Sequence, residues 1–385
     1  MSSRAASSPA VKALTTAAAV VREKMQARRL ARRQAIVAVP VTPIAVYFAD
    51  GPSTLYQLRR WFAPLEALNK VHPTVILVSH PATYRAVSRE TTVPVAFATG
   101  TPQLSRELAR RRIEVILYPN HNAYNFRVLR FSLPLHVFIG HGESGKESSV
   151  SRQLKAYDRA FVADDDSIEL QSHIRGYDAQ NASIVIGSPW LQFLPEPPES
   201  WKPDDRTVVL YAPTWEGDRP TMAYGSLESH GEAIVAAVLA DPSLRLIYRP
   251  HPWLGRVRPA SAAADARIRK ALADAGRHDF VDLGEYGWSL EAADVCVTDV
   301  SSVAYDARAL GKPLIVTVPA SNSIPPVPES AYRDAVALLA DDAAQVVAVV
   351  AAARSRAARA PARAKSSAFI DAVTEVLQIS RTPDS

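Results

Sequence analysis

Short apolar runs rich in Val and Ile recur along the chain, and each is followed by a stretch compatible with a helix. In the first half the runs are Ile44 to Asp50, Thr74 to Ser79, Val95 to Ala98, Glu114 to Pro119, His136 to Gly140, Arg159 to Ala163 and Ser183 to Gly187. In the second half they are Thr207 to Pro213, Arg245 to Pro250, Phe280 to Leu283, Asp294 to Asp299 and Pro313 to Val318. Near-continuous apolar strands separated by helices are typical of parallel sheets covered on both faces. The pattern predicts an α/β fold, with further Ala-rich helix over most of Tyr332 to Gln378.

A proline-rich segment, LPEPPESWKPDD from Leu194 to Asp205, separates the two series of strands. It can continue neither a helix nor a central strand, so we expect a linker there. A chain of 385 residues suits two moderate domains. The predicted layout is a basic helical segment at 1–34, a Rossmann-like domain at 35–193, the linker at 194–205 and a second Rossmann-like domain at 206–385. Ligands of such sheets bind beyond the carboxyl ends of the strands, so we expect the site in a cleft between the two domains.

The basic charge is concentrated at the N-terminus. The formal net charge is +5, and Met1 to Arg33 holds eight Lys and Arg residues against Glu23 alone, so the remainder sums to about −2. A nearly neutral body gives no support for a nucleic-acid partner. The basic segment fits either a helix attracted to an anionic membrane surface or an ordinary solvated helix.

Targeting and redox signals favour a cytoplasmic protein, with peripheral attachment to the inner membrane face as one interpretation. The apolar run Ala17 to Val21 is too short for a secretory signal, and prolines interrupt Ala35 to Ala49 before it could span a bilayer. The single cysteine, Cys296, cannot form an internal disulfide. We expect no metal site, because the sequence holds no His/Cys/carboxylate ligand cluster.

The stretch Asp294 to Val316 predicts a strand, a polar turn with Ser301 and Ser302, and a helix over Val303 to Leu310 that is closed by Gly311. One serine would occupy the N-cap, where a hydroxyl satisfies free backbone N–H groups. A strand that feeds a helix through this turn favours bound phosphate, because open N–H groups and the helix dipole attract anions. An ordinary capped turn is the alternative.

Polar residues follow three other predicted strands. His141 lies between two glycines after His136 to Gly140, where an imidazole would suit a general base, although a lone histidine is often structural. The same loop nearly matches a phosphate-binding P-loop, from Gly140 to Lys146. Glu147 stands where that loop requires Ser or Thr, which argues against an ATPase or GTPase and leaves Lys146 as a plain cation for phosphate.

The remaining clusters also suit phosphate. Arg249 and His251 flank Pro250 in the sequence RPHP, so the backbone holds both side chains at a strand tip and they suit a diphosphate. Thr214 ends another strand and could donate to phosphate. Asp306 lies on the helix after the serine turn, where it could orient the turn or bind a substrate hydroxyl. A rigid loop with exposed polar residues is the alternative for RPHP.

In this order the clusters resemble the CDP-glycerol glycerophosphotransferases, which prime and polymerise teichoic acids. That family carries HGT-P-LK, PTWR, RPHP and TDYSS stretches, the last followed by Asp. Here they appear as HGESGK from His141, PTWE from Pro213, RPHP from Arg249 and TDVSSVAYD from Thr298 to Asp306. The resemblance spans roughly Val137 to Val318 and implies the two-domain glycosyltransferase B fold.

The resemblance also implies a reaction and roles. Phosphoglycerol would pass from CDP-glycerol, the donor substrate, to a hydroxyl of a lipid-linked or polymer acceptor, with CMP leaving and no cofactor or metal. His141 would activate the acceptor hydroxyl, and His251 with Arg249 would stabilise the donor phosphates. Ser301 and Ser302 would bind phosphate, and Asp306 would support donor binding.

Two departures from the family pattern bear on the substrate. Glu216 replaces the arginine of PTWR, and Glu143, Ser144 and Gly145 stand where the family usually has Thr, Pro and Leu. A carboxylate at 216 would repel phosphate, and Arg219 is the nearby cation that could compensate. The alternatives are CDP-ribitol or another alditol donor, a glycosyltransferase that uses a nucleotide sugar, and a non-catalytic relative that binds nucleotide or polymer.

Overall fold

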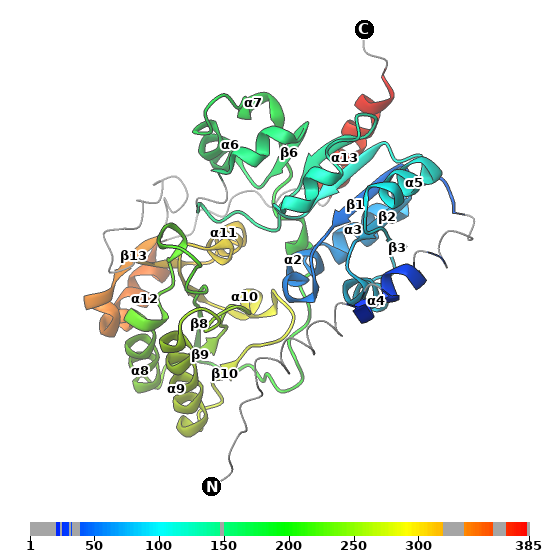
Figure 1. The fold of residues 1–385 in the computed structure, drawn as a ribbon. Helices are drawn as coiled ribbons and strands as arrows, with labels where there is room; N and C mark the ends of the chain where they lie inside the picture. Colours follow the sequence, from blue (N-terminus) through cyan, green and yellow to red (C-terminus); the bar gives the residue numbers. More distant parts are fainter. Residues whose placement is uncertain are drawn as a thin grey trace. The chain divides into compact units, whose positions relative to one another are not determined.

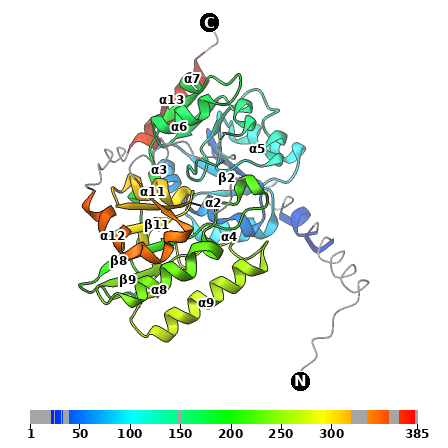
Figure 2. The same cartoon turned by 90° about the vertical axis from the view of Figure 1, so that its left-hand side faces the viewer.

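The computed structural model describes residues 21–23, 25–30, 32, 39–146, 150–318, 335–356 and 367–382. The chain divides into two compact units (Figures 1 and 2). The first comprises Met1–His141, Ala156–Arg159 and Val373–Ser385, and the second comprises Gly142–Lys155 and Ala160–Ala372. The predicted basic helix at 1–34 lies mostly outside the described residues and stays a prediction.

The first sheet has the strand order β3-β2-β1-β4-β5-β6-β7. Its strands are β1 (Ile44–Phe48), β2 (Thr74–Val78), β3 (Val95–Phe97), β4 (Val115–Tyr118), β5 (Leu135–Phe138), β6 (Arg159–Val162) and β7 (Ser183–Val185). The helices of this part are α2 (Tyr56–Arg59), α3 (Phe62–Val71), α4 (Pro81–Glu90), α5 (Thr101–Arg111), α6 (Asp165–Ser172) and α7 (Ala179–Ala182), and α13 (Ala368–Arg381) ends the chain. The pairs β1–β2, β1–β4, β2–β3, β4–β5 and β6–β7 are all parallel.

The second sheet, order β10-β9-β8-β11-β12-β13, is parallel throughout. Its strands are β8 (Thr207–Ala212), β9 (Leu244–Tyr248), β10 (Phe280–Val281), β11 (Val295–Thr298), β12 (Leu314–Val318) and β13 (Val336–Leu339). Its helices are α8 (Glu232–Ala240), α9 (Pro259–Ala275), α10 (Trp288–Ala292), α11 (Ser302–Ala309) and α12 (Val346–Ser355). Two parallel-sheet, Rossmann-like halves confirm the predicted fold class.

Alternate residues along the strands of the second sheet pack against helices on its two faces. Val209 and Tyr211 of β8 pack with residues of α8, α9 and α12, whereas Val208, Leu210 and Ala212 pack with residues of α10 and α11. Successive side chains of a strand point to opposite faces, so a fully apolar run provides two cores at once. Figure 1 shows α8, α9 and α12 grouped on one side of these strands.

Two differences from the sequence prediction concern the second half. Strand β13 lies in the stretch expected to be helical, where its short run VALL precedes Ala-rich helix and pairs with β12 from Ile315↔Val336 to Val318↔Leu339. Four residues are too few to show strand alternation against a helical background. The proline-rich segment has no helix or strand and separates β7 from β8, whereas the compact units divide after His141. The predicted domain boundaries therefore stay a prediction.

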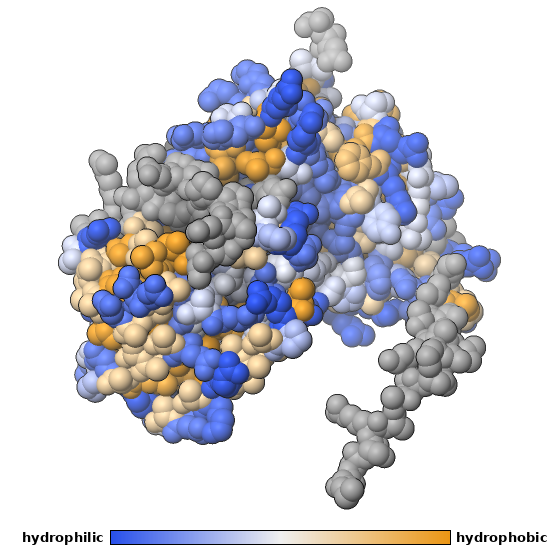
Figure 3. Space-filling view, turned by 60° about the vertical axis from the view of Figure 1, so that its left-hand side comes forward, coloured by the Kyte–Doolittle hydropathy of each residue, from blue (hydrophilic) through white to orange (hydrophobic). Residues whose placement is uncertain are grey.

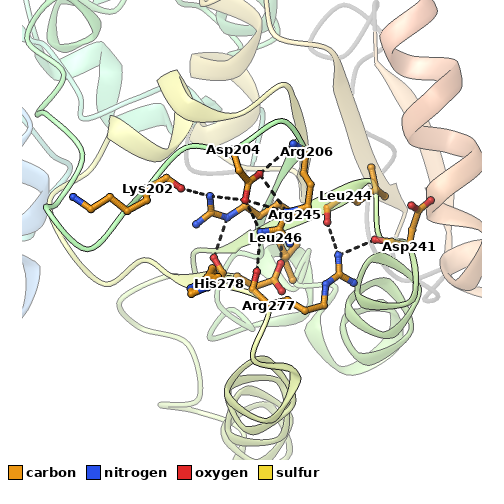
Figure 4. Close-up of polar contacts among 10 residues, drawn as sticks. Lys202, Asp204, Arg206, Asp241, Leu244, Arg245, Leu246, Arg277 and His278 are labelled. Atoms are coloured by element: carbon orange, nitrogen blue, oxygen red, sulfur yellow. Dashed lines mark hydrogen bonds and ion pairs between the residues drawn. The ribbon is translucent and has the colours of Figure 1, made fainter.

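The proline-rich segment is fastened to the amino end of β9 (Figure 4). Arg245, 2% exposed, donates to the carbonyls of Lys202 and His278 and forms an ion pair with Asp204. Its guanidinium also lies 3.8 Å from the centre of the Trp201 ring. These contacts hold the proline-rich segment against the amino end of β9, at the end of the sheet opposite to the carboxyl ends of the strands.

Among the described residues, no helix combines the length and apolarity needed to cross a membrane.

The face drawn in Figure 3 mixes hydrophilic and hydrophobic residues. Such a mixture is ordinary for a protein whose apolar strands are interior, because polar groups never cover the whole surface.

Candidate active site

His141 follows β5 in the first unit, between Gly140 and Gly142, whose φ angles are 59° and 122°. Glycine adopts such left-handed angles without strain, so the loop can turn sharply on both sides of the imidazole. The Nδ1 of His141 lies 3.1 Å from the carbonyl oxygen of Pro119. Because a carbonyl only accepts, Nδ1 carries the proton of the neutral ring and Nε2 carries the lone pair.

The backbone around His141 is held by two long side chains. Arg60 donates to the His141 carbonyl at 2.6 Å, and the indole of Trp61 donates to the Gly140 carbonyl at 2.6 Å. Burial, and then the neighbouring charge of Arg60, lower the pKa of His141 to about 4. The imidazole is therefore neutral at pH 7, as a proton acceptor must be.

In the second unit, Ser301 occupies the N-cap of α11 with extended backbone angles, and Gly311 follows the helix with φ 69°. The predicted strand, turn, helix and stop are all present. The predicted capping bond is not, because the Ser301 side chain makes no cap hydrogen bond. Among the described residues its buried hydroxyl has no partner at all. Ser302, which follows it, is the first residue of the helix.

Asp299 organises the strand ends around this turn. Its buried carboxylate accepts from the backbone N–H of Thr214 at 2.7 Å and of Ser226 at 3.1 Å, and from the Thr317 hydroxyl at 2.6 Å. Burial raises the pKa of Asp299, whereas these donors oppose the rise. One carboxylate at the end of β11 thus binds both the chain after β8 and strand β12.

Lys146 and Thr214, both predicted as phosphate ligands, lie in contact. The Lys146 ammonium donates to the Thr214 hydroxyl at 3.3 Å and is buried. Burial, partly offset by the charge of Asp299, lowers the pKa of Lys146 to about 8. The lysine is an internal cation beside the β8 end rather than a solvated one.

Arg249 and His251 follow β9, as predicted. Arg249 forms an ion pair with the buried carboxylate of Asp282, which follows β10, and its guanidinium lies 5.2 Å from the centre of the Tyr286 ring. The backbone N–H of Trp253 donates to Nδ1 of His251 at 3.0 Å. The neutral His251 ring must then carry its proton on Nε2, which makes that atom a donor.

Glu216 turns away from any phosphate and into its own chain. Its buried carboxylate accepts from three backbone N–H groups, those of Gly255 at 2.9 Å, Val257 at 2.8 Å and Arg258 at 3.0 Å. Burial alone would raise the pKa of Glu216, but the backbone donors outweigh it and the pKa is lowered. The carboxylate binds the loop between His251 and α9, so its expected repulsion of substrate phosphate does not follow from its position.

Asp306 is enclosed within the second unit. The Trp190 indole donates to its Oδ1 at 3.1 Å, and the Tyr286 hydroxyl donates to its Oδ2. These bonds connect α11 to the loop before α10 and to the chain after β7. They identify Asp306 as an anchor of the helix that presents Ser301.

All the predicted donor residues belong to the second unit, and His141 belongs to the first. The sequence reading missed Asp282 and the internal role of Glu216, and it placed Asp299 beside the serine turn without its contacts to the chain after β8 and to β12. Asp282 and Asp299 each come directly after an apolar strand, which was the available signal. Among the described residues, no group of three or more His, Cys, Asp or Glu side chains could hold a metal ion.

Comparison with known proteins bears on the second unit most directly. The family model described as CDP-Glycerol:Poly(glycerophosphate) glycerophosphotransferase matches residues 141–323. This match covers just under half of the chain and indicates an enzyme of the glycerophosphotransferase type. No curated protein matches the whole sequence.

Several solved structures share the fold of this chain at low sequence identity. They include UDP-GlcNAc 2-epimerase from Neisseria meningitidis bound to UDP-GlcNAc, with TM-score 0.59, 12% identity and coverage of 89% of this chain and 100% of that one. A glycosyltransferase from Rickettsia africae has TM-score 0.54, 10% identity and coverage of 89% and 99%. A variant of the wall teichoic acid polymerase TagF has TM-score 0.52, 13% identity and coverage of 88% and 90%. These likenesses place the chain in the predicted glycosyltransferase B fold.

Proposed function

We propose that this enzyme transfers glycerol phosphate, or a related alditol phosphate, from a CDP-alditol to a hydroxyl of a teichoic-acid-like or other cell-surface glycopolymer, and releases CMP. The observation that carries the proposal is the serine turn of the second unit. A buried Ser301 hydroxyl without a partner lies at the N-terminus of α11, inside the region that matches the glycerophosphotransferase family. A phosphate oxygen would supply the missing partner, and the helix dipole would favour its charge.

The proposed chemistry begins at His141. Its Nε2 lone pair takes the proton from the acceptor hydroxyl, while the bond from Nδ1 to the Pro119 carbonyl keeps the ring in this tautomer. The acceptor oxygen then attacks the phosphorus that bears the alditol. The bond from that phosphorus to the bridging oxygen breaks, and CMP leaves.

His251 and Arg249 are proposed to stabilise the phosphate of the departing CMP. The Trp253 bond to Nδ1 keeps the proton of the neutral His251 ring on Nε2, so this N–H can donate a hydrogen bond to a phosphate oxygen of departing CMP. Arg249 is oriented by Asp282 and adds positive charge for the diphosphate. Thr214 and Lys146 stabilise the β8 end and complete the proposed donor site.

The third part of the proposal concerns partners and location. We propose a nucleotide-activated donor, a lipid-linked or polymer acceptor, and attachment of the basic segment Met1 to Arg33 to the anionic inner face of the membrane, with no metal in the reaction. The support for attachment is the net charge of that segment, +7 from eight basic residues and one acid. Sedimentation of the full chain with anionic liposomes that is unchanged by deletion of 1–33 would refute it, and activity lost to EDTA would refute metal independence.

One assay tests the reaction itself. Purified full-length protein is incubated with CDP-glycerol, CDP-ribitol or UDP-sugars and a glycerol-phosphate acceptor, and the released nucleotide is measured. CMP release that falls by at least ~10²-fold in His141→Ala supports the proposal, because a general base contributes about that much. UDP release would indicate a nucleotide-sugar glycosyltransferase, and nucleotide binding without release would indicate a non-catalytic relative.

A further inference from the structure

A second polar cluster lies in the first unit, at the carboxyl ends of β1 and β4, and the proposed donor chemistry does not use it. Asp50 follows β1, and Asn120 and Asn122 follow β4. The Asn120 amide nitrogen donates to Asp50 Oδ2 at 2.6 Å and to Gln57 Oε1 at 2.7 Å. Asn122 donates to the other oxygen of Asp50. The cluster is therefore built as a connected network, with the carboxylate of Asp50 at its centre.

This network fixes the orientation of the Asn120 amide. Both partners of its nitrogen are acceptors, so the nitrogen and oxygen cannot exchange places. The oxygen Oδ1 must lie on the other side, where it is buried and has no hydrogen-bond partner among the described residues. A buried acceptor held in position without a donor requires an explanation, because folded proteins pair nearly all such groups.

The next residue carries a second unpaired atom. The His121 ring lies flat on Phe138, with centroids 4.1 Å apart and 7° between the planes. Its Nδ1 is buried and likewise without a partner among the described residues. Burial and then the neighbouring His141 lower the pKa of His121 to about 4, so the ring is neutral at pH 7. The stacking leaves the ring little freedom to find another partner.

Both unpaired atoms belong to residues that directly follow the backbone contact of the candidate base. Pro119, Asn120 and His121 are consecutive, and the Pro119 carbonyl accepts from His141 Nδ1 at 3.1 Å. The three residues therefore form one backbone segment that orients His141 and presents an acceptor from Asn120 and a ring nitrogen from His121. All of these groups belong to the first unit, whereas the proposed donor residues belong to the second.

We propose that Asn120 and His121, supported by Asp50, form a subsite for the polyol end of the acceptor. This rests on the proposed function, because it names where that reaction's acceptor binds. A hydroxyl both donates and accepts, so neighbouring hydroxyls of an alditol can satisfy Asn120 Oδ1 and His121 Nδ1 together. A phosphate cannot, because Asn120 Oδ1 offers only lone pairs and Asp50 adds negative charge. The subsite therefore binds the uncharged polyol in preference to phosphate and places its terminal hydroxyl near His141.

The test uses His121→Phe, which keeps the flat ring on Phe138 and removes only the ring nitrogens. The matched control is His72→Phe, the same change just before the amino end of β2, where His72 forms a hydrogen bond with Thr374. With a short synthetic glycerol-phosphate oligomer as acceptor, H121F is expected to raise the acceptor KM about tenfold, the loss of roughly one hydrogen bond. The donor KM stays within about twofold, and H72F leaves both unchanged.

Calorimetric titration of the same oligomer without donor separates this proposal from the reaction. Binding that weakens in H121F, in a protein that turns over no CDP-alditol, would keep the subsite and refute the proposed function. Turnover by the wild type with an acceptor KM unchanged in H121F would refute the subsite alone. A shift of the donor KM, or an equal effect in H72F, would also overturn it, since a merely structural histidine would act in those ways.

Discussion

Two histidines of this chain show how a backbone contact decides the chemistry of a residue. A carbonyl receives the Nδ1 proton of His141, whereas a backbone N–H donates to Nδ1 of His251. The first contact leaves a lone pair on Nε2 and the second leaves a proton there. The Nε2 atom is thereby a hydrogen-bond acceptor in His141 and a hydrogen-bond donor in His251. Sequence alone gives two histidines, not these two tautomers.

The lowered pKa of His141 predicts the pH dependence of the reaction. A base must be unprotonated, and burial lowers the pKa of this imidazole from 6.5 to about 4. We expect kcat/KM to stay level from pH 7 down to pH 5.5 and to fall only as the pH nears 4, with the profile measured by CMP release. Half-maximal activity near pH 6.5 would contradict this assignment. Folding stability should fall as the pH drops from about 6.5 to about 4, because the unfolded imidazole binds its proton near 6.5 and the folded one only near 4.

Glu216 is the residue where the family's arginine is replaced, and its loss should affect the loop after His251. Glu216→Ala leaves the N–H groups of Gly255, Val257 and Arg258 without their acceptor, which costs about 1 to 3 kcal/mol for each group that stays buried. We expect a lower melting temperature and a raised donor KM. Glu232→Gln is the control, since its exposed pair with Arg267 contributes at most about 1 kcal/mol. A wild-type donor KM in Glu216→Ala would refute the positioning role.

At the scale of the element, the serine turn before α11 allows a test of whether the Ser301 hydroxyl binds donor phosphate or caps the helix. Ser301→Ala removes a hydroxyl that caps nothing, so the usual loss of about 1 kcal/mol for an N-cap is not expected. Donor affinity, measured by calorimetry with CDP-glycerol, should fall instead. Asp178→Ala is the control for a working cap, because its side chain accepts from the Asn181 N–H at 3.3 Å. A Ser301→Ala protein that is destabilised but binds donor normally would contradict this.

The elements themselves were largely predictable, because apolar runs and their stop signals are local. Strands β1 to β12 fall within or beside their predicted ranges, and α11 begins one residue early. The exception is β13, whose four residues VALL pair with β12 only through tertiary contact. The lost cap at Ser301 has the same origin. A hydroxyl's partner depends on packing, which a sequence pattern does not contain.

The candidate site was predictable as residue types and less so as contacts. Lys146 and Thr214 were both predicted, but their contact joins positions 68 residues apart. Asp299 and Asp282 hold the site through partners on neighbouring strands, which requires the strand order. The predicted roles of the site residues await the assays above.

At the scale of the whole molecule, the chain returns to its first unit at its end. Residues 373–381 of helix α13 belong to that unit and are held there by the His72–Thr374 bond at 2.7 Å and the Arg381–Glu114 ion pair at 2.6 Å. Leu377→Ala, at a position 3% exposed, should destabilise the protein by about 2 to 5 kcal/mol. Ile379→Ala, at 39% exposed, is the matched control on the same helix and should cost much less. Denaturant unfolding measures both, and equal effects would refute a docked helix.

This return of the chain sets an order of events during synthesis. Asn120 and His141 are synthesised early, but residues 373–382 of the same unit are synthesised only after the whole second unit. At ~5 to 20 residues per second, the first unit waits on the order of 10 to 50 s for helix α13. Throughout that interval its surface for α13 is uncovered. A nascent chain therefore completes its second sheet before its first unit, and any chaperone it needs would act on the first unit.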